Sequence, residues 1–131
     1  MNNQTVMGFD YGERRIGVAV GQTVTRTAQA LITLRVQNGQ IDWPAIAELI
    51  ATWRPSQLVL GLPGNNDGQI HPNAAPIARF ARRLAGRFQL PVAFVDERLS
   101  SYAAAEDPAA RRLGLDAVAA RLILETWLAG C

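Results

Sequence analysis

The chain has 131 residues, a net charge of +2 and 49% hydrophobic residues, so we expect a single folded domain over residues 1–131. No apolar run reaches the roughly 18 residues that a membrane-spanning helix needs. The first residues also lack the basic and apolar regions of a signal peptide. We therefore expect a cytoplasmic protein with no membrane partner. The only cysteine, Cys131, has no partner for an internal disulfide.

The basic residues are all arginine, 13 in number, and the chain has no lysine. Arginine binds phosphate through two hydrogen bonds at once, so this composition is compatible with a nucleic-acid partner. A bias in the base composition of the genome would produce the same count. Because +2 does not by itself indicate a polyanionic partner, the positions of the arginines matter more than their number.

The apolar periodicity predicts three strands, followed by helices and strands in alternation. Gly12 suits a tight turn between the first two strands. Asp42 suits the N-cap of the first helix, and Pro44 its first turn. The strands are expected at residues 5–11, 15–21, 28–36, 58–60 and 92–95, and the helices at 43–53, 73–88 and 115–129, with a short one from 100 or 101 to 106.

Three antiparallel strands followed by helix, strand, helix, strand and helix indicate an α/β protein with a mixed five-stranded sheet flanked by helices. Ligands of such sheets bind at the carboxyl ends of the strands. Asp10 and Glu97 both follow apolar strand segments and are expected at such ends.

Asp10, Glu97 and Asp116 are the candidate catalytic and metal-binding residues. If the fold brings them together, they form a set of hard oxygen ligands that suits Mg²⁺ or Mn²⁺. Paired divalent ions of this kind support phosphodiester cleavage, one activating water and the other stabilising the leaving 3′ oxygen. Each acid also has a structural explanation. Asp10 can stabilise its own turn, and Glu97 can meet water at a strand end. Asp116 can interact favourably with the positive end of a helix dipole.

The segment Asp96-Glu97-Arg98 holds two adjacent acids directly after an apolar strand. Neighbouring residues of a strand face opposite ways, so one acid is expected to be a ligand and the other to support it. The alternative is an ordinary strand end at which Arg98 pairs with one of the acids.

Several polar and basic residues are candidates for substrate binding. The loop with Asn65 and Asp67 follows a buried strand and offers polar groups to a nucleic-acid backbone, although it can equally be an ordinary connector. Arginines beside Asp10 and before Asp116 can steer a phosphate toward the acids. The full candidate set is Gly12, Arg14, Arg15, Asn65, Asp67, Arg98, Arg111 and Arg112.

The second predicted helix carries Arg79, Arg83 and Arg87 at intervals of four residues. Like charges at this spacing repel one another by a few tenths of a kcal/mol per pair. A phosphate chain along the helix would relieve this repulsion. The alternative is a charged face in contact with water.

The motifs together resemble the RuvX (YqgF) family. They are Asp-x-Gly with Arg-Ile-Gly-Val-Ala, Gly-Leu-Pro with Asn-x-Asp-Gly, Asp-Glu-Arg-Leu-Ser, and an acid with Ala-Ala-x-x-Ile-Leu in a last helix. The matches run from Phe9 to Trp127. The resemblance implies a ribonuclease H-like fold and a nuclease that matures the 5′ end of pre-16S ribosomal RNA. The family acids carry over to Asp10, Glu97 and Asp116. Its loop carries over to Gly61, Leu62, Pro63, Asn66, Asp67 and Gly68, where Asn66 counts only as the neighbour of the matching Asn65.

The chain departs from the family pattern in three places. Gly21-Gln22 follows the second strand where many members have Ser-Asp. The segment before Asp116 is short and lacks lysine, which bears on substrate affinity and choice. Gly64 and Asn66 stand where larger apolar residues are usual.

Other functions remain open on the sequence. A four-way junction resolvase would use the same chemistry on structured DNA and needs a symmetric dimer, whereas we expect a monomer or a weak homodimer. A ribosome-associated binding factor would keep the fold without catalysis, but three acids would repel phosphate in the absence of a metal. An actin-like ATPase shares the Asp-x-Gly turn but needs a second domain, which 131 residues do not supply.

Overall fold

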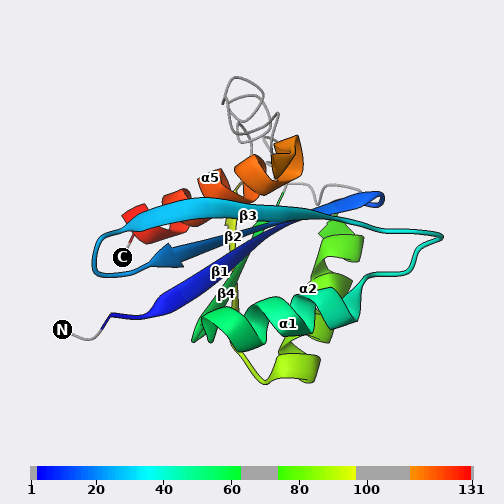
Figure 1. Cartoon of the computed structure of the whole chain (residues 1–131), viewed down its shortest axis with the longest axis horizontal. Helices are drawn as coiled ribbons and strands as arrows, with labels where there is room; N and C mark the ends of the chain where they lie inside the picture. Colours follow the sequence, from blue (N-terminus) through cyan, green and yellow to red (C-terminus); the bar gives the residue numbers. More distant parts are fainter. Residues whose placement is uncertain (1–2, 63–73, 97–112, 131) are drawn as a thin grey trace.

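The computed structural model describes residues 3–62, 74–96 and 113–130. These residues form one five-stranded sheet with helices on both faces (Figure 1). In chain order the elements are β1 (Thr5–Tyr11), β2 (Arg15–Gln22), β3 (Thr27–Arg35), α1 (Trp43–Trp53), β4 (Gln57–Leu62), α2 (Ala74–Phe88), β5 (Val92–Asp96) and α5 (Leu115–Ala129).

The strands are arranged in the order β3-β2-β1-β4-β5. The first three form an antiparallel meander, while β4 and β5 run parallel to β1. The carboxyl ends of β1, β4 and β5 therefore lie at the same edge of the sheet, where polar residues of all three can meet. The mixed five-stranded sheet predicted from the sequence is confirmed.

One face of the sheet carries α1 and α2 over a core of large side chains (Figure 1). Phe80 of α2 lies at its centre, with its ring centroid 5.8 Å from that of Phe9 and 5.7 Å from that of Trp43. Edge-to-face and tilted aromatic pairs of this kind add to the burial of apolar area. The buried members of this core are Met7, Phe9, Ile16, Val18, Val20, Leu34, Trp43, Ile46, Leu58, Leu60, Ile77, Phe80, Ala81 and Leu84.

Among the described helices, α5 is the one on the opposite face, and the first half of its buried surface consists of small and β-branched residues. A side chain at Gly8 would come within 3.1 Å of the Ala120 carbonyl oxygen and of Leu124 Cβ. The helix axis can therefore lie close to β1 and β2. Its four consecutive buried residues, Ala117–Ala120, are small or β-branched, which permits the same close approach.

The local signals of the first helix are confirmed. The Asp42 carboxylate accepts a hydrogen bond from the Ala45 N–H at 3.1 Å, and a proline stands in the first turn. The helix ends at Trp53, and its C-cap residue Arg54 adopts the left-handed conformation at φ 50° before Pro55. Leu58, Val59 and Leu60 are fully buried, as expected for a strand covered on both faces.

The other elements agree with the predicted ranges to within two residues at the described ends. Strand β2 extends one residue further than expected, and β3 begins and ends one residue earlier. The short helix expected near residues 100–106 lies outside the described residues. Among the described helices, none combines the length and apolar character needed to cross a bilayer.

Candidate active site

Asp10 lies near the carboxyl end of β1 and is half-buried. Its cross-strand partner on β2 is Gly17. Side chains alternate along β1: Phe9 belongs to the core under α1 and α2, whereas Val6 packs against α5. The same alternation assigns Asp10 to the α5 face of the sheet.

Asp116 lies in the first turn of α5 and is also half-buried. A Cβ atom at Gly17 would overlap the Asp116 carbonyl and would lie 2.6 Å from the Ala117 nitrogen. The start of α5 therefore rests directly on the residue opposite Asp10. Directly opposed residues of an antiparallel pair have Cβ positions about 5 Å apart. The structure thus brings the two predicted acids into one region, from elements more than a hundred residues apart in the sequence.

Thr33 of β3 holds the start of α5 in this position. Its hydroxyl donates to the Leu113 carbonyl at 2.8 Å and accepts from the Ala117 N–H at 3.2 Å. Gly114, the N-cap residue, has φ 96° and supplies no side-chain cap of its own. A Cβ at Gly114 would overlap Thr33 Oγ1. Thr33 therefore performs from a neighbouring strand the capping that Ser or Asp usually performs within the helix.

The remaining predicted acid, Glu97, lies outside the described residues. Its neighbour Asp96 is the last residue of β5 and is exposed. Val95 packs in the core under α5, so the alternation along β5 assigns Asp96 to the opposite face. In ranges 3–62, 74–96 and 113–130, no cluster of three or more His, Cys, Asp or Glu side chains is arranged to hold a metal.

Three of the predicted substrate-binding residues lie beside Asp10. Gly12 and Arg14 are in the β1–β2 turn, and Arg15 begins β2; both arginines are exposed. The Gly12 N–H donates to the Arg15 carbonyl at 2.9 Å, and a Cβ at Gly12 would lie 2.8 Å from the same oxygen. Five predicted substrate-binding residues lie outside the described residues: Asn65, Asp67, Arg98, Arg111 and Arg112.

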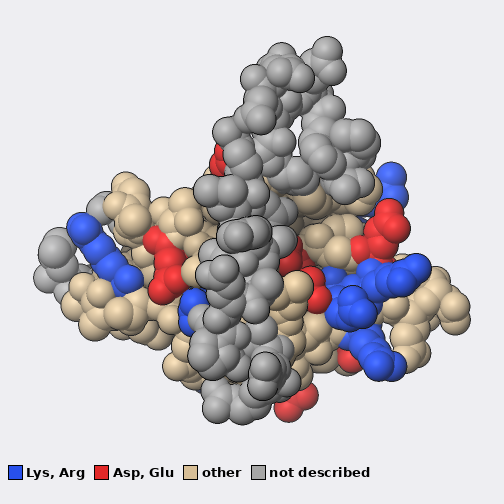
Figure 2. All heavy atoms as spheres, turned by 90° about the horizontal axis from the view of Figure 1, so that it is seen from above, with Lys and Arg blue, Asp and Glu red and all other residues tan. Residues whose placement is uncertain are grey.

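Arginine side chains gather at one end of the α5 face, over the end of the sheet that holds the β1–β2 turn (Figure 2). Acidic side chains lie next to them in the same view. This end of the sheet therefore combines positively and negatively charged side chains, and positive charge there can attract a phosphate.

The arginines of α2 have a different environment. The guanidinium carbons of Arg83 and Arg87 lie 5.2 Å and 4.2 Å from the centroid of the Trp43 ring. Cation–π contacts of this kind are favourable and account for two of the three arginines in this series. Helix α2 also lies on the opposite face of the sheet from α5 (Figure 1). The geometry favours a structural role for this series over the predicted alternative of a phosphate track.

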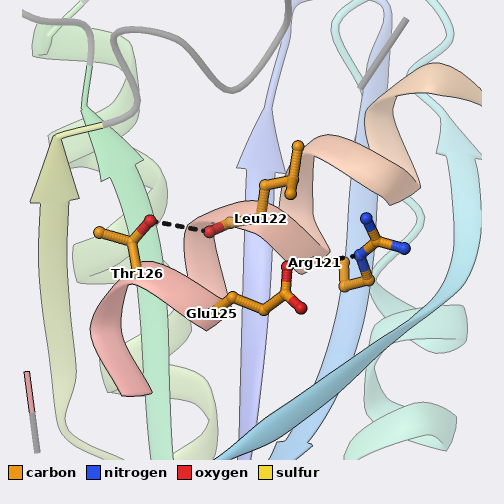
Figure 3. Close-up of polar contacts among 4 residues, drawn as sticks. All are labelled: Arg121, Leu122, Glu125 and Thr126. Atoms are coloured by element: carbon orange, nitrogen blue, oxygen red, sulfur yellow. Dashed lines mark hydrogen bonds and ion pairs between the residues drawn. The ribbon is translucent and has the colours of Figure 1, made fainter. Parts of the chain in front are cut away.

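Figure 3 shows two polar contacts within α5, each one helical turn long. Arg121 Nε lies 3.6 Å from Glu125 Oε1, one helical turn away. The Thr126 hydroxyl donates to the Leu122 carbonyl at 2.9 Å. Both side chains are partly buried, and an i,i+4 pair of opposite charge stabilises the helix by a few tenths of a kcal/mol.

Two residues that shape the site were missed in the sequence. Thr33 is a single polar residue within the apolar segment of residues 30–34. Gly114 precedes a helix and supplies no capping side chain, which indicates that the cap comes from elsewhere in the fold. These two observations together are the signal that could have identified Thr33.

Comparison with known proteins assigns the family. The model of the family described as RuvX, Holliday junction resolvase, matches residues 4–130. The chain belongs to the RuvX family. A relative from Pseudomonas putida named "Putative pre-16S rRNA nuclease" is 47% identical, with 94% of this chain and 93% of the relative covered. A relative of the same name from Burkholderia mallei is 50% identical, with 96% and 88% covered. The RuvX family member described here is accordingly a nuclease, a hydrolase of nucleic acid.

A solved structure agrees with the predicted ribonuclease H-like fold. T. thermophilus RuvC, in complex with a Holliday junction substrate, superposes with a TM-score of 0.54 at 13% identity. The alignment covers 97% of this chain and 94% of the RuvC chain. At this identity the similarity concerns the fold, which the sheet order and the position of α5 already indicate.

Proposed function

We propose that this RuvX family member is a divalent-metal-dependent nuclease that processes the 5′ end of pre-16S rRNA. The observation that carries the proposal is the contact of Asp116 with Gly17, the strand partner of Asp10. It draws two carboxylates from distant elements to one end of the sheet. The choice of pre-16S rRNA as the substrate comes from the names of the relatives.

We propose Asp10, Glu97 and Asp116 as the ligands of Mg²⁺ or Mn²⁺. Carboxylate oxygens are hard donors, which these ions prefer. Asp10 and Asp116 are both half-buried, so their side chains are shielded in part from water. Thr33 caps the first turn of α5 from β3, so the Asp116 side chain is not needed for that role. When bound, paired divalent ions supply an activated water and offset the charge on the leaving oxygen.

The chain's own residues would then bind and orient the substrate. Gly12 keeps the turn beside Asp10 free of a side chain, which allows close approach of a backbone phosphate. Positive charge holds the substrate in register without reading its bases. The residues proposed for this role are Gly12, Arg14, Arg15, Asn65, Asp67, Arg98, Arg111 and Arg112. No protein nucleophile is needed, because water attacks the phosphorus.

The test is cleavage, in Mn²⁺, of an RNA that carries the 5′ leader of the small-subunit ribosomal RNA. The wild-type protein is expected to cut it, and Asp10→Asn is expected to lose at least about a thousandfold in rate, since it removes a metal ligand. Asp42→Asn is the matched control, because Asp42 caps α1 on the other face of the sheet. Asp10→Asn protein with undiminished cleavage would overturn the proposal.

A four-way junction resolvase is the second candidate, favoured by the description of the matched family. It predicts cleavage of a four-way DNA junction and a stable symmetric dimer, since two strands must be cut. Sedimentation of the protein with and without a junction separates the two candidates. A monomer or weak homodimer that cuts only the RNA supports the processing nuclease.

The setting of the reaction follows from the same proposal. A nuclease for pre-16S rRNA would act in the cytoplasm, on RNA already assembling into ribosomal particles. Adding purified precursor particles in place of naked RNA tests this partner. If neither substrate is cut but the particles bind, a non-catalytic ribosome-associated factor replaces the nuclease.

A further inference from the structure

Two arginines stand opposite each other at the end of the β2–β3 hairpin. Arg15, the first residue of β2, has Arg35, the last residue of β3, as its cross-strand partner. Both side chains are exposed. Directly opposed residues of an antiparallel pair point to the same face, with Cβ atoms about 5 Å apart. The fold therefore holds two guanidinium groups side by side.

The residues that the structure describes do little to offset this pair of charges. Like charges in directly opposed positions destabilise a sheet. Within ranges 3–62, 74–96 and 113–130, neither Arg15 nor Arg35 forms an ion pair or a contact with an aromatic ring. By contrast, Arg83 and Arg87 lie over Trp43. An unfavourable pair that the described structure leaves uncompensated suits an anion from outside.

The pair lies on the same face of the sheet as the acids. Along β2, Ile16 and Val18 face the core under α1 and α2, whereas Gly17 faces α5. Arg15 therefore shares the α5 face with Gly17. On β3, Thr33 bonds the start of α5, so Arg35, two residues later, takes the same face.

The residues on this face form two adjacent rows across the sheet. Asp10, Gly17 and Thr33 are aligned across β1, β2 and β3, and the start of α5 lies on this row. The next row on the same face contains Arg15 and Arg35. Two residues along a strand span about 7 Å. This is close to the separation of neighbouring phosphates along a nucleic-acid strand.

We propose that Arg15 and Arg35 together bind one backbone phosphate of the substrate, next to the phosphate that is cut. The inference rests on the proposed function, because the Asp10 and Asp116 region marks the point of cleavage, and it adds Arg35 to the substrate-binding residues. Two planar guanidinium groups can each donate two hydrogen bonds to one phosphate. The contact recognises the backbone, so it is independent of base sequence.

The experiment measures binding of a labelled single-stranded RNA in Ca²⁺, which occupies carboxylate sites without the octahedral geometry of Mg²⁺, under conditions where no cleavage is detected, over a series of KCl concentrations. Arg35→Gln is expected to weaken binding about tenfold, the loss typical of a charged hydrogen bond. It is also expected to reduce the slope of log K against log salt by about 0.7, the value for one phosphate contact on a single strand. Arg35→Lys keeps the charge and is expected to retain the slope.

Arg26→Gln is the matched control. Arg26 is an exposed arginine in the turn at the other end of the same hairpin, with φ 56°. The Arg26→Gln variant loses the same charge, but far from the acids. Its RNA affinity and salt slope are expected to change only by the small general effect of one lost positive charge. Arg35→Gln binding indistinguishable from Arg26→Gln overturns the inference, as does a wild-type protein that fails to bind the RNA.

The unfolding midpoint separates binding from stability. Because the two arginines repel each other, Arg35→Gln is expected to keep or raise the midpoint, whereas a structural role would lower it. The proposed function fails separately. If the wild-type protein cuts neither substrate while Arg35→Gln lowers the salt slope, the phosphate site stands and the nuclease does not. If the wild-type protein cuts RNA and Arg35→Gln leaves the salt slope unchanged, the nuclease stands and the phosphate site does not.

Discussion

The two faces of the sheet are built in different ways. Under α1 and α2 lie large side chains such as Phe9, Trp43 and Phe80, most of them fully buried. Under α5 lie Gly8 and Gly17, which allow the helix backbone close to the strands. Apolar contact between large side chains is non-directional, so the first face supplies stability. Close backbone contact fixes position, so the second face sets the geometry of the acids.

The polar residues follow the same division. Asp10, Thr33 and the Arg15–Arg35 pair all belong to the α5 face, while the arginines of α2 stack on Trp43. A substitution in the α1/α2 face should therefore change the free energy of unfolding more than the rate or metal dependence of cleavage. A change in the α5 face should alter the chemistry more than stability. Three substitutions test this division, taken here from the largest expected effect to the smallest.

Leu84→Ala removes a fully buried side chain from the α1/α2 face. It is expected to lower the free energy of unfolding by about 3 kcal/mol, through lost burial and the cavity that remains. In the fraction that stays folded at low temperature, the Mn²⁺ requirement for cleavage should be unchanged. Denaturant titration and a metal titration of activity check the two parts. A raised metal requirement would contradict the division between the faces.

Gly17→Ala places a methyl group where the Asp116 carbonyl lies. Helix α5 must move away, and a displacement of about 1 Å at a catalytic group can cost about a hundredfold in rate. We expect such a loss of cleavage in a protein that remains folded. Gly86→Ala is the control, because beyond the backbone of its own helix nothing lies within 4 Å of its added Cβ. Equal activity of the Gly17 and Gly86 variants would show that α5 is not positioned by this contact.

Thr33→Val keeps the shape of the side chain but removes both hydrogen bonds to the start of α5. A lost N-cap costs about 1 kcal/mol of unfolding free energy. Because the first turn carries Asp116, we also expect the Mn²⁺ concentration for half-maximal cleavage to rise. Thr33→Ser retains the hydroxyl and should restore the metal dependence. If Thr33→Ser does not restore the metal dependence, Thr33 acts through packing and not through its hydroxyl.

Most of the fold follows from local signals in the sequence. The alternation of Ile16, Val18 and Val20, and the Asp42 and Pro44 signals of α1, predict elements that the structure confirms. These signals act between neighbouring residues, so the sequence expresses them directly. The pairing of Asp10 with Gly17, and of Gly17 with Asp116, depends on residues far apart in the chain. The sequence indicated the three acids as a group, but it did not indicate which contacts hold them.

Thr33 and Arg35 show why the rest of the site was missed. Each looks unremarkable beside its neighbours in the sequence, as one polar residue in an apolar strand and one exposed arginine at its end. Their roles appear only with the register of β2 against β3, which pairs Thr33 with Gly17 and Arg35 with Arg15. Register depends on the whole sheet, so local patterns do not determine which residues face each other.

Calorimetric titration of Mn²⁺ into the metal-free protein tests the central claim, that Asp10 and Asp116 contribute to one metal site. The account expects the wild-type protein to bind Mn²⁺, and Asp10→Asn and Asp116→Asn each to weaken that binding. The loss of binding free energy in the double variant should not exceed the sum of the losses in the two single variants. Asp42→Asn should bind as wild type does. Wild-type binding in both single variants would contradict the account.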